Sequence, residues 1–153
     1  MDRIVRLYDL PSFDREKLQK QNITIRLAKA YEKTKVLDWV KKHFSQEWAD
    51  ETDVAFANNP ISCFIATKEG IIVGFACFEA TCKNFFGPIG IDKNYRGKGL
   101  GKALLLASLH EMKHLGYAYA IIGGGDGVEG FYQSINAQEI EGSTPGIYRD
   151  FLK

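Results

Sequence analysis

The chain has 153 residues, of which 45% are hydrophobic and 25% are charged, a composition typical of one soluble folded domain and unlike that of a disordered or fibrous protein. A chain of this length buries enough surface to form a core without a disulfide or a structural metal. Its 20 basic and 19 acidic residues give a formal net charge of +1, so the overall charge does not favour nucleic acid or an anionic membrane, and any anion site must be local.

The cysteines and the apolar runs favour a cytoplasmic location. The chain has an odd number of cysteines, Cys63, Cys77 and Cys82, and no CxxC pair. We expect these thiols to stay reduced. The longest apolar run, residues 71–78, is too short to span a bilayer. The first ten residues also lack the apolar stretch of a secretory signal.

The N-terminal region differs in composition from the rest of the chain. Residues 1–22 are rich in charged side chains and weakly apolar, and Pro11 interrupts them. We expect an appended arm or a short helix here, in front of a domain that spans residues 23–153.

A strand and two helices are predicted next. The alternating apolar pattern of residues 23–27 indicates a half-buried strand. Apolar side chains at spacings of three and four residues then predict a helix over residues 31–44. Ser45 is a suitable N-cap for a second helix that runs towards Phe56.

The middle of the sequence predicts three strands. Residues 61–67 and 70–79 are rich in β-branched and aromatic side chains, and the sequence Lys68-Glu69-Gly70 at their junction suits a short hairpin loop. Residues 85–91 form the third strand. Because Pro88 cannot donate to a ladder and glycines lie on either side of it, we expect a bulge in this strand or a gap beside it.

The last part of the sequence predicts a strand, a helix and a second strand. Residues 100–115 are rich in strong helix formers and are followed by a glycine, and residues 117–122 have the pattern of a strand. The connection from residues 85–91 must then be a right-handed parallel crossover. A short helix over residues 128–135 and a strand-like end at residues 146–152 complete the chain. The fold class is therefore mixed α/β.

The junction between the third strand and the long helix carries the most informative pattern. Gly97, Gly99 and Gly101 alternate across it. Alternating glycines allow successive backbone N–H groups to point into one concavity, and the helix adds its unbonded N–H groups and the positive end of its dipole. Four basic residues surround the turn: Lys93, Arg96, Lys98 and Lys102. The sequence therefore predicts a phosphate-binding turn.

Two other phosphate-binding loops fit the sequence less well. A P-loop requires Ser or Thr after its lysine, whereas Lys102 is followed by Ala103. The dinucleotide fingerprint GxGxxG occurs at residues 125–130, but the 23 residues beyond it are too few for the further strand–helix units of that fold.

The turn resembles the signature of the GCN5-related N-acetyltransferase (GNAT) family. That signature reads Arg or Gln, two variable residues, Gly, one variable residue, and Gly or Ala; residues 96–101 read RGKGLG. The resemblance extends over about residues 23–153. It implies a mostly antiparallel twisted sheet with one parallel strand–helix–strand crossover and helices on both faces. It also implies that the turn holds the pyrophosphate of acetyl-CoA.

The resemblance implies roles for individual residues as well. Tyr132 matches a tyrosine that protonates the departing thiolate of CoA, and Ile91 N–H would polarise the thioester carbonyl. The strand at Ile89 to Ile91 would diverge from its parallel neighbour, so that the pantetheine arm lies in the gap. Glu79, at the end of a central strand, is the candidate base for the amine, with Asp92 and Glu129 as alternatives. The predicted cofactor-binding residues are Ile89, Gly90, Ile91, Arg96, Gly97, Lys98, Gly99, Leu100, Gly101, Lys102 and Tyr132.

We expect an acetyl-CoA-dependent N-acetyltransferase in which a primary amine attacks the thioester directly in a ternary complex. The acceptor is expected to be a small-molecule amine or an amine of a peptide or protein. Trp48, Phe56 and Tyr148 are expected to shape its site. The protein is expected to be a monomer or a homodimer, without a metal and without nucleic acid or a membrane as a partner.

Two alternative functions stay open. One is a CoA-binding or CoA-sensing module without catalysis. The other is a zinc-dependent hydrolase, because His110, Glu111 and His114 fit HExxH on a predicted helix. Lys113 lies near the same helix face and would repel a dication, which argues against zinc.

Overall fold

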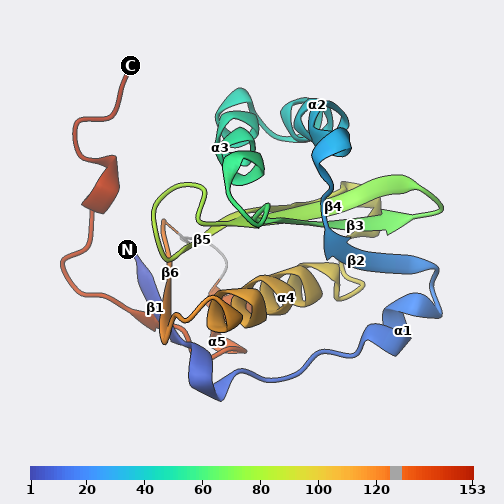
Figure 1. The fold of residues 1–153 in the computed structure, drawn as a ribbon. Helices are drawn as coiled ribbons and strands as arrows, with labels where there is room; N and C mark the ends of the chain where they lie inside the picture. Colours follow the sequence, from blue (N-terminus) through green and yellow to red (C-terminus); the bar gives the residue numbers. More distant parts are fainter. Residues whose placement is uncertain (125–128) are drawn as a thin grey trace.

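The computed structural model describes residues 1–124 and 129–153, and it contains one seven-stranded mixed sheet with helices on both faces (Figure 1). The strand order is β2-β3-β4-β5-β6-β1-β7, and within the described residues only β5 and β6 are parallel neighbours. The strands are β1 (Arg3–Arg6), β2 (Ile23–Leu27), β3 (Cys63–Lys68), β4 (Ile71–Phe78), β5 (Phe85–Ile91), β6 (Tyr119–Ile122) and β7 (Gln138–Glu139).

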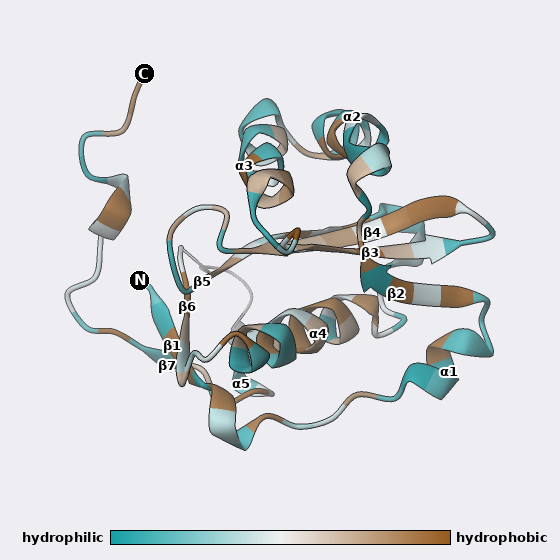
Figure 2. Cartoon of the chain, in the orientation of Figure 1, coloured by the Kyte–Doolittle hydropathy of each residue, from teal (hydrophilic) through white to brown (hydrophobic). Residues whose placement is uncertain are grey.

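The helices divide between the two faces of the sheet (Figure 1). Leu104, Leu105 and Leu109 of α4 are fully buried against one face, and Val36, Val40 and Ala55 of α2 and α3 are buried against the other. The central strands are mostly hydrophobic, whereas α2 and α3 carry many hydrophilic residues (Figure 2). None of the described helices has the length and apolar character needed to cross a bilayer. The helices are α1 (Arg15–Gln19), α2 (Lys33–His43), α3 (Gln46–Ala57), α4 (Leu100–His114) and α5 (Glu129–Gln133).

Strand β5 carries the predicted irregularity. Its pairing with β4 shifts register between Ala76 and Phe78. Gly87, on β5 opposite this shift, has a φ of 115°, a conformation that favours glycine. On its other edge, β5 pairs with β6 only at Phe85 and Phe86 within the described residues. The rest of β5, as far as Ile91, runs past the end of β6 and has no paired strand on that edge in the described part of the chain, in line with the predicted gap.

The N-terminal segment contains the expected short helix, α1, but it is not an appended arm. Residues 3–6 form β1, which lies between β6 and β7 in the sheet. Val5 and Leu7 are fully buried in the core that α4 covers. The sequence pattern did not reveal this strand because its first residue, Arg3, is charged yet buried; its guanidinium bonds Glu139 at 3.1 Å.

The other predicted elements agree with the structure except at the C-terminal end. Ser45 caps α3, since its Oγ accepts a hydrogen bond from Trp48 N at 3.1 Å. The predicted short helix corresponds to α5, and its expected first residue, Val128, lies outside the described residues. The strand predicted for residues 146–152 is wrong: this segment contains a 3-10 turn, Gly146–Tyr148, and ends in an exposed tail.

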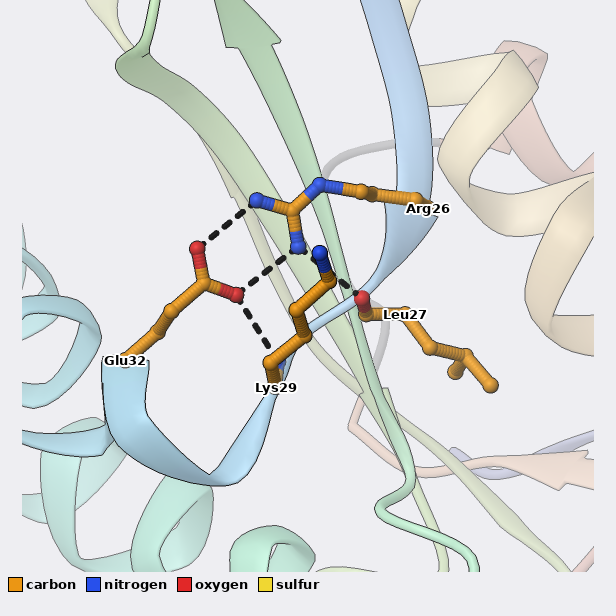
Figure 3. A network of polar contacts seen from close by, with 4 residues as sticks. All are labelled: Arg26, Leu27, Lys29 and Glu32. Atoms are coloured by element: carbon orange, nitrogen blue, oxygen red, sulfur yellow. Dashed lines mark hydrogen bonds and ion pairs between the residues drawn. The ribbon is translucent and has the colours of Figure 1, made fainter.

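A polar network fixes the connection from β2 to α2 (Figure 3). Arg26 donates to the two carboxylate oxygens of Glu32 at 2.8 and 2.7 Å, and to Leu27 O at 3.2 Å. Lys29 N donates to Glu32 Oε1 at 2.8 Å. The hydrogen bonds from Arg26 hold the pKa of Glu32 at about 2. The network orients α2, whose C-terminal end reaches the cavity described next.

Candidate functional site

A cavity of about 850 Å³ follows β5. Its walls come from β5, the α2–α3 junction, the start of α4, the residues after β6, α5 and the C-terminal turn. The lining residues are Phe44, Trp48, Glu51, Thr81, Phe85, Phe86, Gly87, Pro88, Ile89, Gly90, Ile91, Arg96, Gly101, Ile122, Gly123, Gly124, Phe131, Tyr132 and Tyr148.

The backbone of β5 presents polar groups to this cavity. Asp92 N donates to Val73 O at 2.9 Å, so the backbone of Asp92 faces β4. Alternate residues of an antiparallel ladder turn to opposite edges, and the N–H and C=O groups of Ile89 and Ile91 therefore point away from β4. Both residues line the cavity, and Arg96 Nε donates to Ile91 O at 3.3 Å. This edge can pair with an extended ligand.

The glycine turn lies next to one end of the cavity, which Arg96 and Gly101 line. Gly97 and Gly99 have φ values of 77° and 83°, which favour glycine, and a Cβ atom at either position would meet no atom within 4 Å. The turn is therefore open above its backbone. Helix α4 begins directly after it, with no acidic residue in the first turn, so the positive end of the helix dipole points at the turn. This arrangement can hold a phosphate or a diphosphate.

The structure brings part of the predicted cofactor site together at the cavity. Leu100 is buried, with an exposed fraction of 1%, so only its backbone could contact a ligand. The exposed turn residues Gly97, Lys98, Gly99 and Lys102 lie outside the lining of the cavity. The predicted residues that line it are Ile89, Gly90, Ile91, Arg96, Gly101 and Tyr132.

Tyr132 is a buried phenol at the cavity wall, with an exposed fraction of 6%. Its ring meets the Phe131 ring edge-on at 5.1 Å, and the guanidinium carbon of Arg3 lies 5.7 Å from the ring centroid. Burial raises the pKa of Tyr132 above its ordinary value, and the charge of Arg3 offsets part of this rise. The phenol is therefore protonated at neutral pH and can donate a proton.

The structure places Glu79 outside the cavity lining, contrary to its expected role as a base. It lies at the turn between β4 and β5, where its Oε1 accepts from Asn84 N at 3.1 Å and its Oε2 lies 3.6 Å from Lys83 Nζ. A hydrogen bond with Glu79 also raises the pKa of Tyr117. The carboxylate thus orders the turn between the two strands and does not line the cavity.

The structure supports neither of the alternative bases, Asp92 and Glu129, more strongly than Glu79, and it does not support the second glycine motif as a binding site. Asp92 Oδ1 accepts from Asn94 N at 2.9 Å and caps a 3-10 turn, and Asp92 does not line the cavity. The side chain of Glu129 and most of the GxGxxG segment at residues 125–130 lie outside the described residues.

The other end of the cavity carries a carboxylate that the sequence analysis missed. Glu51, on α3, lines the cavity and accepts a hydrogen bond from Thr81 Oγ1 at 2.7 Å. Trp48 and Tyr148 also line the cavity, as expected for an acceptor site, whereas Phe56 packs against the core beneath α2 and α3. Burial raises the pKa of Tyr148, and the charge of Glu51 adds to the effect. The spacing of Trp48 and Glu51, one helical turn apart, was a signal for this wall.

Aromatic side chains close the cavity on the side of α2 and α3. The Phe44 ring lies over Gly90, where a Cβ atom would overlap it. Its centroid lies 5.1 Å from that of Trp48 and 5.8 Å from those of Trp39 and Phe75. Gly90 thus allows this aromatic cluster to contact the strand directly.

The HExxH residues do not converge on a metal site. The Nε2 atom of His110 is hydrogen-bonded to Pro11 O at 2.9 Å, and His114 Nδ1 lies 3.8 Å from Glu111 Oε2. No group of three or more His, Cys, Asp or Glu side chains suited to a metal ion occurs in the part of the chain that the structure describes.

Solved structures share this fold. A GCN5-related glucosamine N-acetyltransferase region of a fungal multi-domain β-N-acetylglucosaminidase matches 90% of this chain and 19% of its own, with a TM-score of 0.72 and 13% identity. A GCN5-related N-acetyltransferase from Sphaerobacter thermophilus matches 90% of this chain and 47% of its own (TM-score 0.67, 16% identity). A GNAT family acetyltransferase from Brucella melitensis, solved with acetyl-CoA, matches 76% of this chain and 85% of its own (TM-score 0.58, 16% identity).

The chain thus spans less than half the length of the first two of these structures. No curated protein matches it. The sequence profile of the acetyltransferase (GNAT) family, however, matches residues 26–135, which is well over half of the chain and includes β5, the glycine turn, α4 and Tyr132. The chain therefore belongs to the GNAT family of acetyltransferases.

Proposed function

We propose that the protein transfers the acetyl group of acetyl-CoA to a primary amine. The observation that supports this most strongly is the continuity of the cavity, which follows the gap beside β5 and ends at Arg96 and Gly101, next to the rest of the glycine turn. This shape suits a ligand with a diphosphate at one end and an extended, amide-containing arm at the other, as in CoA.

The residues present fit each part of that ligand. Arg96, the backbone at Gly101 and the first N–H groups of α4 would hold the diphosphate. The N–H and C=O groups of Ile89 and Ile91 would pair with the arm as a strand would. The absence of side chains at Gly97 and Gly99 leaves the approach to the helix end open.

The chemistry follows from the groups beside the arm. Acetyl-CoA supplies an activated acetyl group as a thioester. Ile89 N–H, which faces away from β4 and lies closer to the Glu51 end than the Ile91 N–H expected from the sequence, would donate a hydrogen bond to the carbonyl oxygen as it gains charge. The amine nitrogen forms the new C–N bond and loses its proton to water, while the C–S bond breaks and Tyr132 donates its phenolic proton to the departing sulfur. Tyr132 then regains a proton from solvent.

Replacing Tyr132 tests the catalytic part of the proposal. Tyr132→Phe should lower the turnover number by about a hundredfold or more, because the proton donor is lost while the ring stays in place. The Kd for CoA, measured by calorimetry, should change less than about twofold, since the phosphate contacts are retained. Tyr31→Phe, at a side chain 79% exposed and outside the cavity, is the matched control.

The outcomes separate the candidate functions. Unaltered turnover in Tyr132→Phe would remove this residue from the chemistry. Binding of CoA by the wild-type protein without transfer to any amine would indicate a CoA-binding module.

The monomeric or homodimeric state and the cytoplasmic location of the protein stay predictions.

A further inference from the structure

We propose that the Glu51 end of the cavity is the acceptor subsite, and that it selects primary amines that carry a second positive charge, such as diamines. This inference rests on the proposed acetyl transfer and narrows its substrate class. In such an acceptor the reacting nitrogen is neutral when it attacks, and the distal ammonium pairs with Glu51.

The cavity has opposite charges at its two ends. Among the described residues that line it, Glu51 has the only carboxylate side chain and Arg96 the only basic one. Arg96 lies at the C-terminal end of β5, because it donates a hydrogen bond to Ile91, the last residue of that strand. Glu51 lies at the other end, because its partner Thr81 precedes the strand. At about 3.3 Å per residue, β5 separates the two ends by about 20 Å. The diphosphate requires the Arg96 end, so the acceptor must occupy the Glu51 end.

Glu51 is available to a cation. Among the described residues, Glu51 accepts a hydrogen bond from the Thr81 hydroxyl and forms no ion pair with a lysine or an arginine. A carboxylate offers about four lone-pair sites, of which the Thr81 bond uses one. That bond also fixes the orientation of the carboxylate at the cavity wall. The remaining lone pairs can accept hydrogen bonds from a ligand ammonium.

The neighbouring walls suit the same ligand. The rings of Trp48, Tyr148 and Phe85 line the cavity together with Glu51. Aromatic faces attract alkylammonium groups and cover the methylene carbons between two amines. An acceptor that carries a carboxylate would instead be repelled by Glu51, because no described cation lies at that end of the lining. The negative charge of Glu51 therefore favours diamines over amino acids as acceptors.

The test measures binding and transfer with three amines of similar length: putrescine, butylamine and γ-aminobutyrate. Calorimetry on protein saturated with CoA should give a Kd for putrescine about tenfold or more below that for butylamine, with γ-aminobutyrate weakest. The order of kcat/KM, measured by thiol release from acetyl-CoA, should be the same. In Glu51→Gln the Kd for putrescine should rise about 10- to 100-fold, the loss expected for a hydrogen-bonded charge pair.

Glu47→Gln is the matched control, because Glu47 is exposed on the same helix and lies outside the cavity lining. It should keep the wild-type preference for putrescine over butylamine. A preference for butylamine or γ-aminobutyrate in the wild type, or an equal change in both amines in Glu51→Gln, would overturn the inference. Failure of the wild-type protein to bind CoA would instead count against the proposed function.

Discussion

Gly90 shows how a single missing side chain shapes the site. It lies on β5, lines the cavity, and is covered by the ring of Phe44. Phe44 is itself held by ring contacts with Trp48 and Phe75. The sequence identified Gly90 as a cofactor contact, and the structure adds a packing role: the glycine determines how closely α2 and α3 approach the sheet.

Gly90→Ala should lower the free energy of unfolding by about 1 to 3 kcal/mol, because the new methyl group forces the Phe44 ring to move within a packed cluster. Denaturation in urea measures this loss. The cost should be smaller when Phe44→Leu is already present, since the overlapping ring is gone, and the two changes should therefore be non-additive. Equal costs of Gly90→Ala in both backgrounds would contradict this packing.

Individual site residues were predictable where their signal was local in sequence. The turn at Gly97 and Gly99 could be identified because glycine spacing and basic neighbours lie within a few residues of each other. Glu51 could not be identified in this way, because it reaches β5 only through the packing of α3 on the sheet and a hydrogen bond from Thr81. The same reason applies to Glu79: its position at the end of a strand is visible in the sequence, but its hydrogen bond from Asn84 N is not.

The connection between β2 and α2 depends on the pair of Arg26 and Glu32 (Figure 3). The pair is partly exposed, with side-chain exposed fractions of 33% and 20%, so solvent screens it. We expect it to contribute about 1 kcal/mol, the upper part of the range for such pairs, because the contact is bidentate. Its effect on the site is indirect, through the position of α2.

Glu32→Gln should therefore reduce stability by about 1 kcal/mol near neutral pH. The pKa of Glu32 in the folded protein, about 2, lies below its ordinary value, so the wild-type advantage is present above the ordinary value and is lost as the pH falls towards about 2. Urea unfolding near neutral pH and at about pH 3 should show a smaller difference at the lower pH. A difference that is the same at both pH values would contradict the role of the ion pair.

Elements were predictable where a long periodic pattern or a capping residue marked them. Ser45 and the leucine-rich pattern of α4 correctly predicted the two helices, and the turn between β3 and β4 lies where the sequence predicted it. Strand β1 was missed because its four residues begin and end with arginine, and its pairing partners β6 and β7 lie more than a hundred residues away. The strand predicted at residues 146–152 has an apolar pattern but no paired neighbour in the described sheet.

The sheet as a unit explains why the cavity exists. Among the described residues, β6 pairs with β5 at Phe85 and Phe86 only, and β1 continues the sheet on the far side of β6. Because β1 also places Arg3 beside Tyr132, the N-terminal segment contributes to the fold and to the surroundings of the proposed acid. Arg96, Gly101, the free edge of β5, Tyr132 and Glu51 thus all line a single cavity.

Binding of CoA at the glycine turn is the claim on which the proposed chemistry depends. A Cβ atom at Gly101 would lie 3.5 Å from the Phe131 ring, an ordinary contact, so this protein can accept a side chain there. A bound diphosphate, however, would need the same space beside the first turn of α4. Gly130, in α5 and outside the cavity lining, is the matched control, because a Cβ there meets no atom within 4 Å.

Calorimetric titration of CoA into the wild-type protein, Gly101→Val and Gly130→Val tests this directly, with thermal unfolding to confirm that all three are folded. We predict that the wild type and Gly130→Val bind CoA with similar affinity, and that Gly101→Val loses binding by about a hundredfold or more, because the side chain displaces the diphosphate from the helix end. Absence of binding by the wild type, or unchanged affinity in folded Gly101→Val, would contradict the placement of CoA at this turn.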